Sequence, residues 1–184
     1  MSKRIALLSA VAFSTLALTA AIVAPARAEE KTVMVGGAAM FPSKNIIQNA
    51  VNSKDHTTLV AAVKAAGLVQ TLEGKGPFTV FAPTNAAFGK LPAGTVDSLV
   101  KPENKATLTK ILTYHVVAGK LDAAALTDGK KLKTVEGEDL MVKREGNHVM
   151  IVDAKGDSSM VTISNVNQSN GVIHVIDTVL LPAS

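Results

Sequence analysis

Hydrophobic and polar residues follow two different periods along the chain, and the period changes near residue 114. Between residues 45 and 112, apolar residues recur every three to four positions, which is the spacing of one helix face. After residue 114 they recur at every second position, in runs of strand length separated by turn signals such as Glu145-Gly146-Asn147. Helices first and hairpins later predict an α+β fold with a mostly antiparallel sheet.

Short polar residues mark where the predicted helices begin. Ser43 is a candidate N-cap for the first helix, Asp55 or Thr57 for the second, and Thr84 or Asn85 for a helical turn after a short strand. The predicted helices cover 45–53, 55–67, 94–100 and 102–112, and the predicted strands cover 78–82, 114–121, 130–135, 138–145, 147–153, 160–166 and 171–181.

The first 28 residues have the layout of a cleaved signal peptide. Lys3 and Arg4 precede an apolar run over 5–24, and residues 26–28 form a small-x-small cleavage site. The run is long enough to span a membrane, so an uncleaved anchor is the competing interpretation. The cleavage site and the Ser and Thr residues within the run favour removal. The sequence therefore predicts an exported protein, periplasmic or secreted, without a stable membrane anchor.

Cleavage would leave an irregular, glycine-containing N-terminal arm at 29–42, one domain at 43–182 and a tail at 183–184. The formal net charge of +4 includes three basic residues of the signal segment, so the mature chain carries only +1. Its charges are interspersed and aromatic residues make up 3% of the sequence, so nucleic-acid binding is not expected. The absence of cysteine excludes disulfides and thiolate metal sites.

Four histidines are the strongest candidates for chemistry. No two of them have the i, i+4 spacing of a helical zinc site, so no metal site is predicted. His56 opens a helix and His148 begins a strand, which predicts that both are solvated. His115 lies where a helix passes into a strand and is expected to be a satisfied core group. His174 lies in a strand that is apolar on both faces, which predicts a buried, neutral, hydrogen-bonded imidazole.

No motif indicates catalysis. The sequence has no Gly-x-Ser-x-Gly elbow, no cysteine nucleophile and no Walker loop, and the stretch 156–158 is only a weak Gly-Asp-Ser match in a loop. A loop serine without an identified base is not an active site. We therefore predict a protein that is not an enzyme and that has no cofactor.

Three segments in order resemble the fasciclin domain family. They are "GPFTVFAPTNAAF" (76–88), "TYHVV" (113–117) and "NGVIHVIDTVLLP" (170–182), and the similarity extends over about 43–182. The resemblance implies an α+β domain with a β-sandwich wedge flanked by helices, a role in cell adhesion or matrix interactions, and no general enzymatic activity. It also implies structural positions for Thr84, Asn85, Tyr114, His115 and His174.

The sequence departs from adhesive animal members of the family just before the third segment. Those members are linked to integrin binding through an Asp-Ile pair, and this chain has Asn165 and Val166 there. Because the carboxylate is missing, integrin recognition is not expected. Asn165, Val166 and Asn167 remain a candidate interaction surface.

The sequence therefore leaves two functions as alternatives. The first is an exported binding module whose partner is a cell-surface or matrix protein or a glycan. The alternative is a carrier of a small apolar ligand such as a lipid or carotenoid, because some fasciclin-domain proteins resemble carriers. Met40, Phe41, Ile46 and Ile47 are the candidate groove for that ligand, against the simpler interpretation that they pack the arm onto the domain.

Overall fold

The structure, a computed structural model, describes residues 31–183. The predicted signal peptide and its cleavage site lie outside these residues. The helices are α1 (Ile46–Ala50), α2 (Thr57–Ala66), α3 (Val69–Glu73), α4 (Asn85–Gly89), α5 (Thr95–Leu99) and α6 (Lys105–Tyr114), with 3-10 turns η1 (Lys54–His56) and η2 (Pro102–Asn104). The strands are β1 (Val33–Val35), β2 (Ala38–Met40), β3 (Phe78–Pro83), β4 (Val116–Ala118), β5 (Lys131–Lys133), β6 (Asp139–Glu145), β7 (His148–Val152), β8 (Ser158–Gln168) and β9 (Gly171–Ile176).

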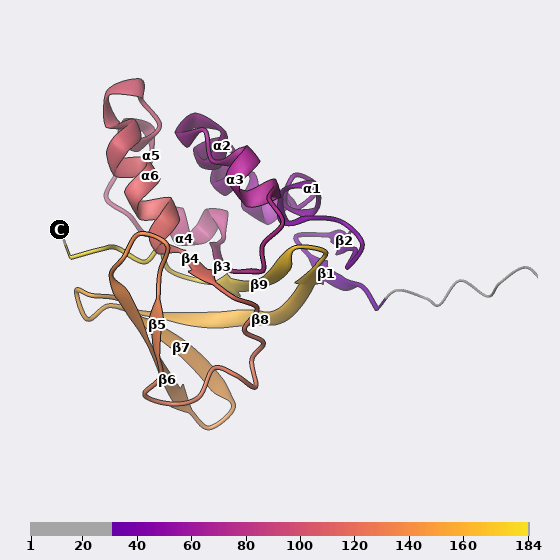
Figure 1. Cartoon of the computed structure of the whole chain (residues 1–184). Helices are drawn as coiled ribbons and strands as arrows, with labels where there is room; N and C mark the ends of the chain where they lie inside the picture. The colour runs from indigo at the N-terminus through magenta and orange to yellow at the C-terminus, as the bar shows by residue number, and fades with distance from the viewer. Residues whose placement is uncertain (1–30, 184) are drawn as a thin grey trace, which may run out of the picture.

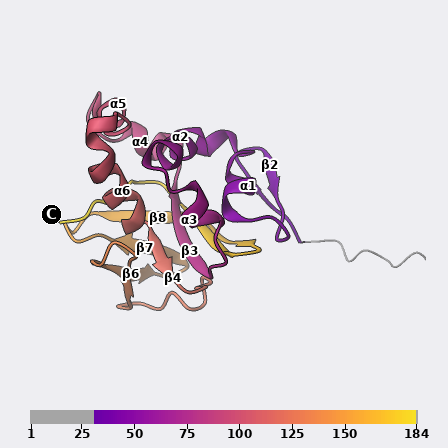
Figure 2. The same cartoon turned by 45° about the horizontal axis from the view of Figure 1, so that its top comes forward.

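Seven strands form one curled sheet in the order β4-β3-β9-β8-β7-β6-β5. The neighbouring pairs are antiparallel except β3 and β9, which run parallel. The two end strands approach each other, because Val117 bridges Thr134 and Val135 N donates to Val116 O at 2.7 Å. The helices lie toward one side of the molecule and strands β6 and β7 toward the other in both views (Figure 1, Figure 2). The predicted α+β class with a mostly antiparallel sheet is confirmed.

The N-terminal arm is not irregular as predicted, because residues 33–40 form a β-hairpin. β1 pairs with β2, and the Gly36-Gly37 turn between them has φ values of 57° and 77°. Two consecutive positive φ angles define a type I′ turn, whose twist matches that of the flanking strands. The Gly-Gly pair between apolar residues was the signal for this hairpin in the sequence.

Two of the predicted helix caps are also wrong. The first helix is capped by Asn45 rather than Ser43, in a capping box with Gln48. The second is preceded by the 3-10 turn η1, which puts His56 at its N-cap position without a side-chain cap from Asp55 or Thr57. Gly67 ends this helix in the left-handed conformation, as glycine does at many helix C-termini.

Strand β9 separates two apolar cores, and all six of its residues are buried. Ile173 and Val175 face the core beneath the helices, whereas Ile176 belongs to the core inside the curled part of the sheet. A strand buried on both faces must be apolar on both faces, which explains the pattern around His174.

Candidate functional site

Thr84 and Asn85 hold two helices at their N-termini. The Thr84 hydroxyl oxygen accepts a hydrogen bond from Ala87 N at 3.2 Å and so caps α4. Asn85 reaches the other helix: its Oδ1 accepts from Thr58 N at 3.0 Å and its Nδ2 donates to Lys54 O at 2.9 Å. These bonds tie α4 to η1 and α2, so both side chains are occupied in positioning helices.

Tyr114 is fully buried and joins the helices to the curled sheet. Its hydroxyl accepts a hydrogen bond from Ala154 N at 2.8 Å and donates to Asp139 O at 3.4 Å. Burial raises the pKa of the phenol to about 12. A group that stays protonated and is held by β6 and by the loop after β7 acts as a structural tie.

His115 is buried with both ring nitrogens paired. Nδ1 lies 2.8 Å from Ile111 O and Nε2 accepts a hydrogen bond from Leu180 N at 3.0 Å. The Nδ1–H donates to the carbonyl, because Nε2 must be the unprotonated acceptor. Burial lowers the pKa of His115 to about 4, and the carbonyl of Ile111 offsets part of that shift. The neutral imidazole thus links α6 to the C-terminal segment.

His174 is buried, as the two-sided apolar strand predicted. Its Nε2 lies 2.8 Å from Leu121 O, and its ring stacks on Phe81 with centroids 5.7 Å apart. Burial lowers the pKa of this imidazole, and the carbonyl of Leu121 opposes that shift. Nδ1 has no hydrogen-bond partner among the described residues. His174 therefore fixes the loop after β4 and is not exposed to solvent.

His56 is the histidine that sequence reasoning placed incorrectly. His148 is exposed as predicted, but His56 is only 3% exposed. The prediction missed η1, whose tight turn carries the ring under the N-terminal hairpin. His56 Nδ1 and the Ser53 hydroxyl share a hydrogen bond of 2.8 Å, and His56 Nε2 has no partner among the described residues. Burial lowers the pKa of His56, while the carbonyl of Ala82 and the carboxylate of Asp55 oppose that shift.

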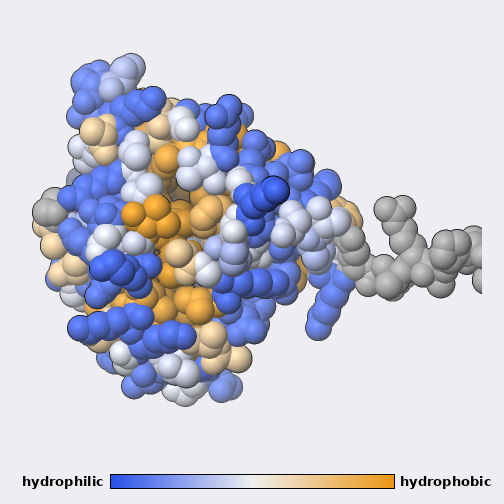
Figure 3. All heavy atoms as spheres, in the orientation of Figure 1, coloured by the Kyte–Doolittle hydropathy of each residue, from blue (hydrophilic) through white to orange (hydrophobic). Residues whose placement is uncertain are grey.

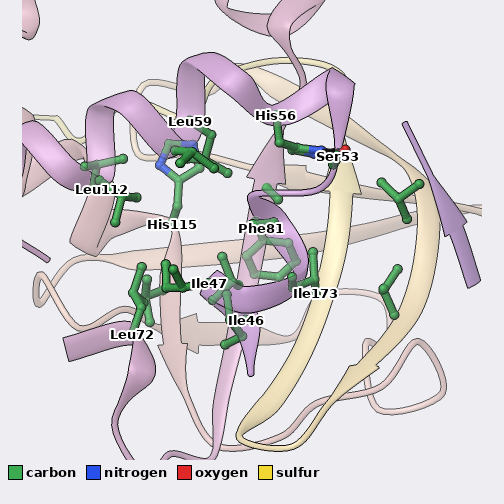
Figure 4. A pocket seen from close by; sticks show the side chains of 18 of the residues that line it. Ile46, Ile47, Ser53, His56, Leu59, Leu72, Phe81, Leu112, His115 and Ile173 are labelled. Atoms are coloured by element: carbon green, nitrogen blue, oxygen red, sulfur yellow. Dashed lines mark hydrogen bonds between the residues drawn. The ribbon is translucent and has the colours of Figure 1, made fainter. Parts of the chain in front are cut away.

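His56 and Ser53 form part of the wall of an internal cavity of about 40 Å³, which we call the hairpin cavity. It lies between the β1–β2 hairpin, α1, α2 and the sheet. Figure 4 shows His56 turned toward Ser53, with Ile46, Ile47 and Ile173 around the apolar space. The Ser53-His56 spacing in the sequence, read as one tight turn, was the only local signal for this pair.

Three of the four predicted groove residues line this cavity. Met40, Ile46 and Ile47 are buried in its wall, together with Val35 from the hairpin. Phe41 does not line it: the side chain is 38% exposed and lies under Lys44, whose Nζ is 5.0 Å from the ring centroid. Whether these residues hold a ligand stays a prediction.

The candidate interaction surface at 165–167 is only partly available. Val166 is 1% exposed and belongs to the core, so it cannot contact a partner. Asn165 adopts φ 58° at an irregular point of β8, and its Oδ1 accepts a hydrogen bond from Ala123 N at 2.7 Å. Asn167 is exposed. Alternation along β8 turns neighbours to opposite faces, so three consecutive residues could not all face outward.

A shallow groove is lined by residues of β4, β5 and the segments beside them, and we call it the β4–β5 groove. Its volume is about 510 Å³, its apolar lining includes Val117, Leu121 and Val135, and its edge carries lysines. Figure 3 shows hydrophobic residues gathered across the middle of this face, with hydrophilic residues on both sides. The basic residues that line it are Lys130, Lys131 and Lys133.

A group of metal-ligating side chains and a membrane-spanning helix are both absent from the described residues. Between 31 and 183, no group of three or more His, Asp or Glu side chains could hold a metal ion. In the same range no helix is both long and apolar enough to cross a bilayer. Ser159, beside the weak Gly-Asp-Ser match, is fully buried, and its hydroxyl donates to Thr178 O at 2.9 Å. The serine is thus used to hold the C-terminal segment.

Comparison with known proteins agrees with this architecture. The family model described as "Fasciclin domain" matches residues 54–182. Protein sll1483 of Synechocystis is 45% identical over 179 residues, covering 97% of this chain and 96% of that protein. The immunogenic protein MPB70 of Mycobacterium bovis is 37% identical over 181 residues, covering 94% of this chain and 89% of that protein.

A third relative and a solved structure extend the comparison. The cell surface glycolipoprotein MPB83 of Mycobacterium bovis is 39% identical over 153 residues, which cover 80% of this chain and 64% of that protein. The structure of a FAS1 domain pair from the insect cell adhesion molecule fasciclin I has a TM-score of 0.68 at 19% identity. It covers 77% of this chain, which spans about half (52%) of that pair, and it shows the fold. This chain therefore belongs to the fasciclin domain family.

Proposed function

We propose that this protein is a non-enzymatic binding module of the cell envelope or extracellular matrix, and that it docks a protein partner in the β4–β5 groove. The names of relatives support the location, since one is a cell surface glycolipoprotein and the fold occurs in an insect cell adhesion molecule. The predicted signal peptide is consistent with export.

The observation that carries the proposal is the exposed valine in the groove. Val135 is 47% exposed and shares the groove with half-buried Leu121, over the buried Val117, and exposed Lys131 and Lys133 also line it. Protein interfaces have such an arrangement, with an apolar centre and a polar rim. The lysines favour a partner with acidic side chains around an apolar anchor residue. A glycan is the alternative partner, but it offers less apolar surface to the groove floor.

A matched pair of valines tests the groove. Val135→Ser should weaken retention of the purified protein on envelope preparations of its host by about tenfold, the typical loss at an interface anchor. Val51→Ser is the control, because Val51 is 50% exposed and lies at the end of α1. Equal retention of both variants would refute the groove as the docking site.

Charge reversal gives a second test of the same surface. Lys131→Glu should reduce binding and its salt sensitivity, because it places a carboxylate at the rim where acidic partner groups are expected. Lys64→Glu in α2 carries the same change in net charge on an exposed position of a different element and serves as the control. If a strain lacking the protein attaches to surfaces as the parent does, the adhesive role itself fails.

A further inference from the structure

The hairpin cavity combines an apolar wall with one unpartnered polar atom. His56 is 97% buried, since its exposed fraction is 3%, and its Nε2 forms no hydrogen bond with the described residues. Buried polar nitrogens are nearly always paired, because leaving one without a partner costs free energy. The His56 ring lines the hairpin cavity, and the carbonyl of Ala82 acts on the ring without forming a hydrogen bond of normal geometry, so a guest in the cavity can supply a better-placed partner.

We propose that the hairpin cavity binds a small aliphatic molecule carrying one hydroxyl group, which pairs with His56 Nε2, and that the β1–β2 hairpin is the lid over it. This goes beyond docking at the β4–β5 groove, which is lined by other residues. A hydroxyl fits either tautomer of His56. If Ser53 donates to Nδ1, Nε2 carries the proton and the ligand hydroxyl accepts a hydrogen bond from it. If Nδ1 carries the proton and donates to Ser53, the ligand hydroxyl donates to Nε2.

The cavity size shows that the lid must move. Its volume is about 40 Å³, whereas an engineered apolar cavity that binds benzene measures roughly 150 Å³. Val35 and Met40 of the hairpin occupy the space that a larger guest would need. Methionine is unbranched and adapts its shape easily, so Met40 is the side chain best suited to give way.

The hairpin is attached to the domain at two places of different strength. At its base, Asn49 brackets Phe41, because Oδ1 accepts from Phe41 N at 3.0 Å and Nδ2 donates to Phe41 O at 2.8 Å. Asn49 also donates to Gln168 of β8. At the tip, Lys54 N donates to Gly36 O at 3.2 Å. The base is thus suited to act as a hinge and the tip as a latch.

Gly36 makes the latch testable. A Cβ added at Gly36 would lie 2.4 Å from the Ser53 hydroxyl and 2.7 Å from Asp55 N, so Gly36→Ala should push the tip away from η1. Gly37 is its matched control: it has φ +77° against +57° for Gly36, and a Cβ there meets nothing within 4 Å. Both substitutions strain the same turn, but only the first disturbs the contact with Ser53.

The experiment uses two probes of similar size, 1-butanol and 1-chlorobutane, which differ in the hydroxyl group. Binding to the full-length mature protein is followed by the ¹⁵N resonance of His56 Nε2 and by the methyl resonances of Ile46 and Ile47. We expect saturable shifts of all three residues with 1-butanol. His56→Phe should weaken 1-butanol by about tenfold and 1-chlorobutane by no more than about twofold, because only the alcohol loses a hydrogen bond.

Two further variants locate the site and the lid. Ala50 also lines the cavity and is half-buried, so Ala50→Phe should fill the space and abolish binding of both probes. Gly36→Ala should bind 1-butanol faster than Gly37→Ala does. If His56→Phe does not fold, the change in the ¹⁵N chemical shift of Nε2 in the unaltered protein shows whether 1-butanol forms the hydrogen bond.

Three results would overturn the proposal. The first is no shift of His56 at saturating 1-butanol in either the unaltered protein or Gly36→Ala. The second is binding that persists in Ala50→Phe, which would place the probe elsewhere. The third is equal association rates for the two glycine variants, which would show that the β1–β2 hairpin does not act as a lid. None of these results bears on the β4–β5 groove, so the two proposals fail separately.

Discussion

Two histidines line the hairpin cavity, and the surroundings of their ring nitrogens differ. His115 uses both nitrogens, one with Ile111 O at 2.8 Å and one with Leu180 N at 3.0 Å. His56 uses Nδ1 with Ser53 and leaves Nε2 without a partner among the described residues. Both rings are buried, at 2% and 3% exposure. Burial alone therefore does not separate a structural histidine from one available to a ligand.

The difference lies in what each histidine connects. His115 joins α6 to the C-terminal segment, two parts of the chain that are 65 residues apart. Among the described residues, His56 forms its hydrogen bond within its own turn, to Ser53 three residues earlier, and the carbonyl of Ala82 also acts on its ring. Replacing His115 should destabilise the fold, whereas replacing His56 should mainly change the hairpin cavity. The predictions below separate these two roles, in order of expected effect.

The largest effect is expected for His115→Ala. It leaves the amide of Leu180 and the carbonyl of Ile111 without their buried partner and opens a cavity, so the free energy of unfolding should fall by about 4 kcal/mol. Urea denaturation followed by circular dichroism measures this loss. A loss of less than about 1 kcal/mol in the free energy of unfolding would contradict the structural role of His115.

Acidification should also destabilise the protein through His115. The folded-state pKa of about 4 lies below the ordinary value of 6.5, so the unfolded chain binds the proton more readily. Stability from this group is present above pH 6.5 and is lost as the pH falls toward 4, by about 3 kcal/mol. Burial also lowers the pKa of His56 and His174, so both groups add to the loss of stability below pH 6.5.

Urea midpoints between pH 7 and pH 4 test this prediction. His115→Gln should make the dependence less steep, because glutamine does not titrate in that range, whereas His56 and His174 still do. His148→Gln serves as the control, because His148 is exposed. A dependence that is equally steep in His115→Gln would assign the effect to other groups.

His174 is an intermediate case and sharpens the comparison. Like His56 it has one unpartnered nitrogen, but it lies on strand β9 against Phe81 and does not line the hairpin cavity. His174→Ala should lower the free energy of unfolding by about 2 kcal/mol, because it leaves Leu121 O unpaired and creates a void. Binding of 1-butanol should be unchanged. Calorimetry checks the loss of stability, and the 1-butanol titration described above checks the binding. A loss of binding would mean that the two unpartnered nitrogens are coupled.

The smallest stability effect is expected for His56→Phe. The substitution removes one hydrogen bond to Ser53 and at the same time removes a nitrogen that has no partner, so the free energy of unfolding should change by about 1 kcal/mol or less. Thermal melts of this variant beside His115→Phe give the contrast directly. If both variants lose stability equally, the distinction between the two histidines fails.

Much of the fold followed from local patterns. The change of period near residue 114 predicted helices before hairpins, and the two-sided apolar pattern around His174 predicted a strand between two cores. The N-terminal hairpin was missed because Gly36-Gly37 was interpreted as loop punctuation, although a pair of glycines between apolar residues also permits a type I′ turn. Position along the chain gave no indication that this segment packs on α1.

The candidate sites were harder to predict than the elements. Met40, Ile46 and Ile47 line the cavity in which a ligand groove was predicted, but Phe41, one residue further, faces away. Val166 was proposed for a surface and lies in the core. Alternation along a strand decides such cases, and it cannot be assigned until the register of the strand is known.

The sequence by itself determined the fold class, the family and the burial of His174, because these depend on periodicity and on motifs carried by contiguous residues. Only the tertiary structure decided the burial of His56 and the partners of His115, which the sequence predicted as a satisfied core group, because those contacts come from turns and segments that the sequence does not place. A buried nitrogen is structural or available according to which distant backbone group reaches it. Which backbone group comes within reach of the nitrogen depends on how the hairpin, the helices and the C-terminal segment pack together. No local sequence pattern encodes that packing.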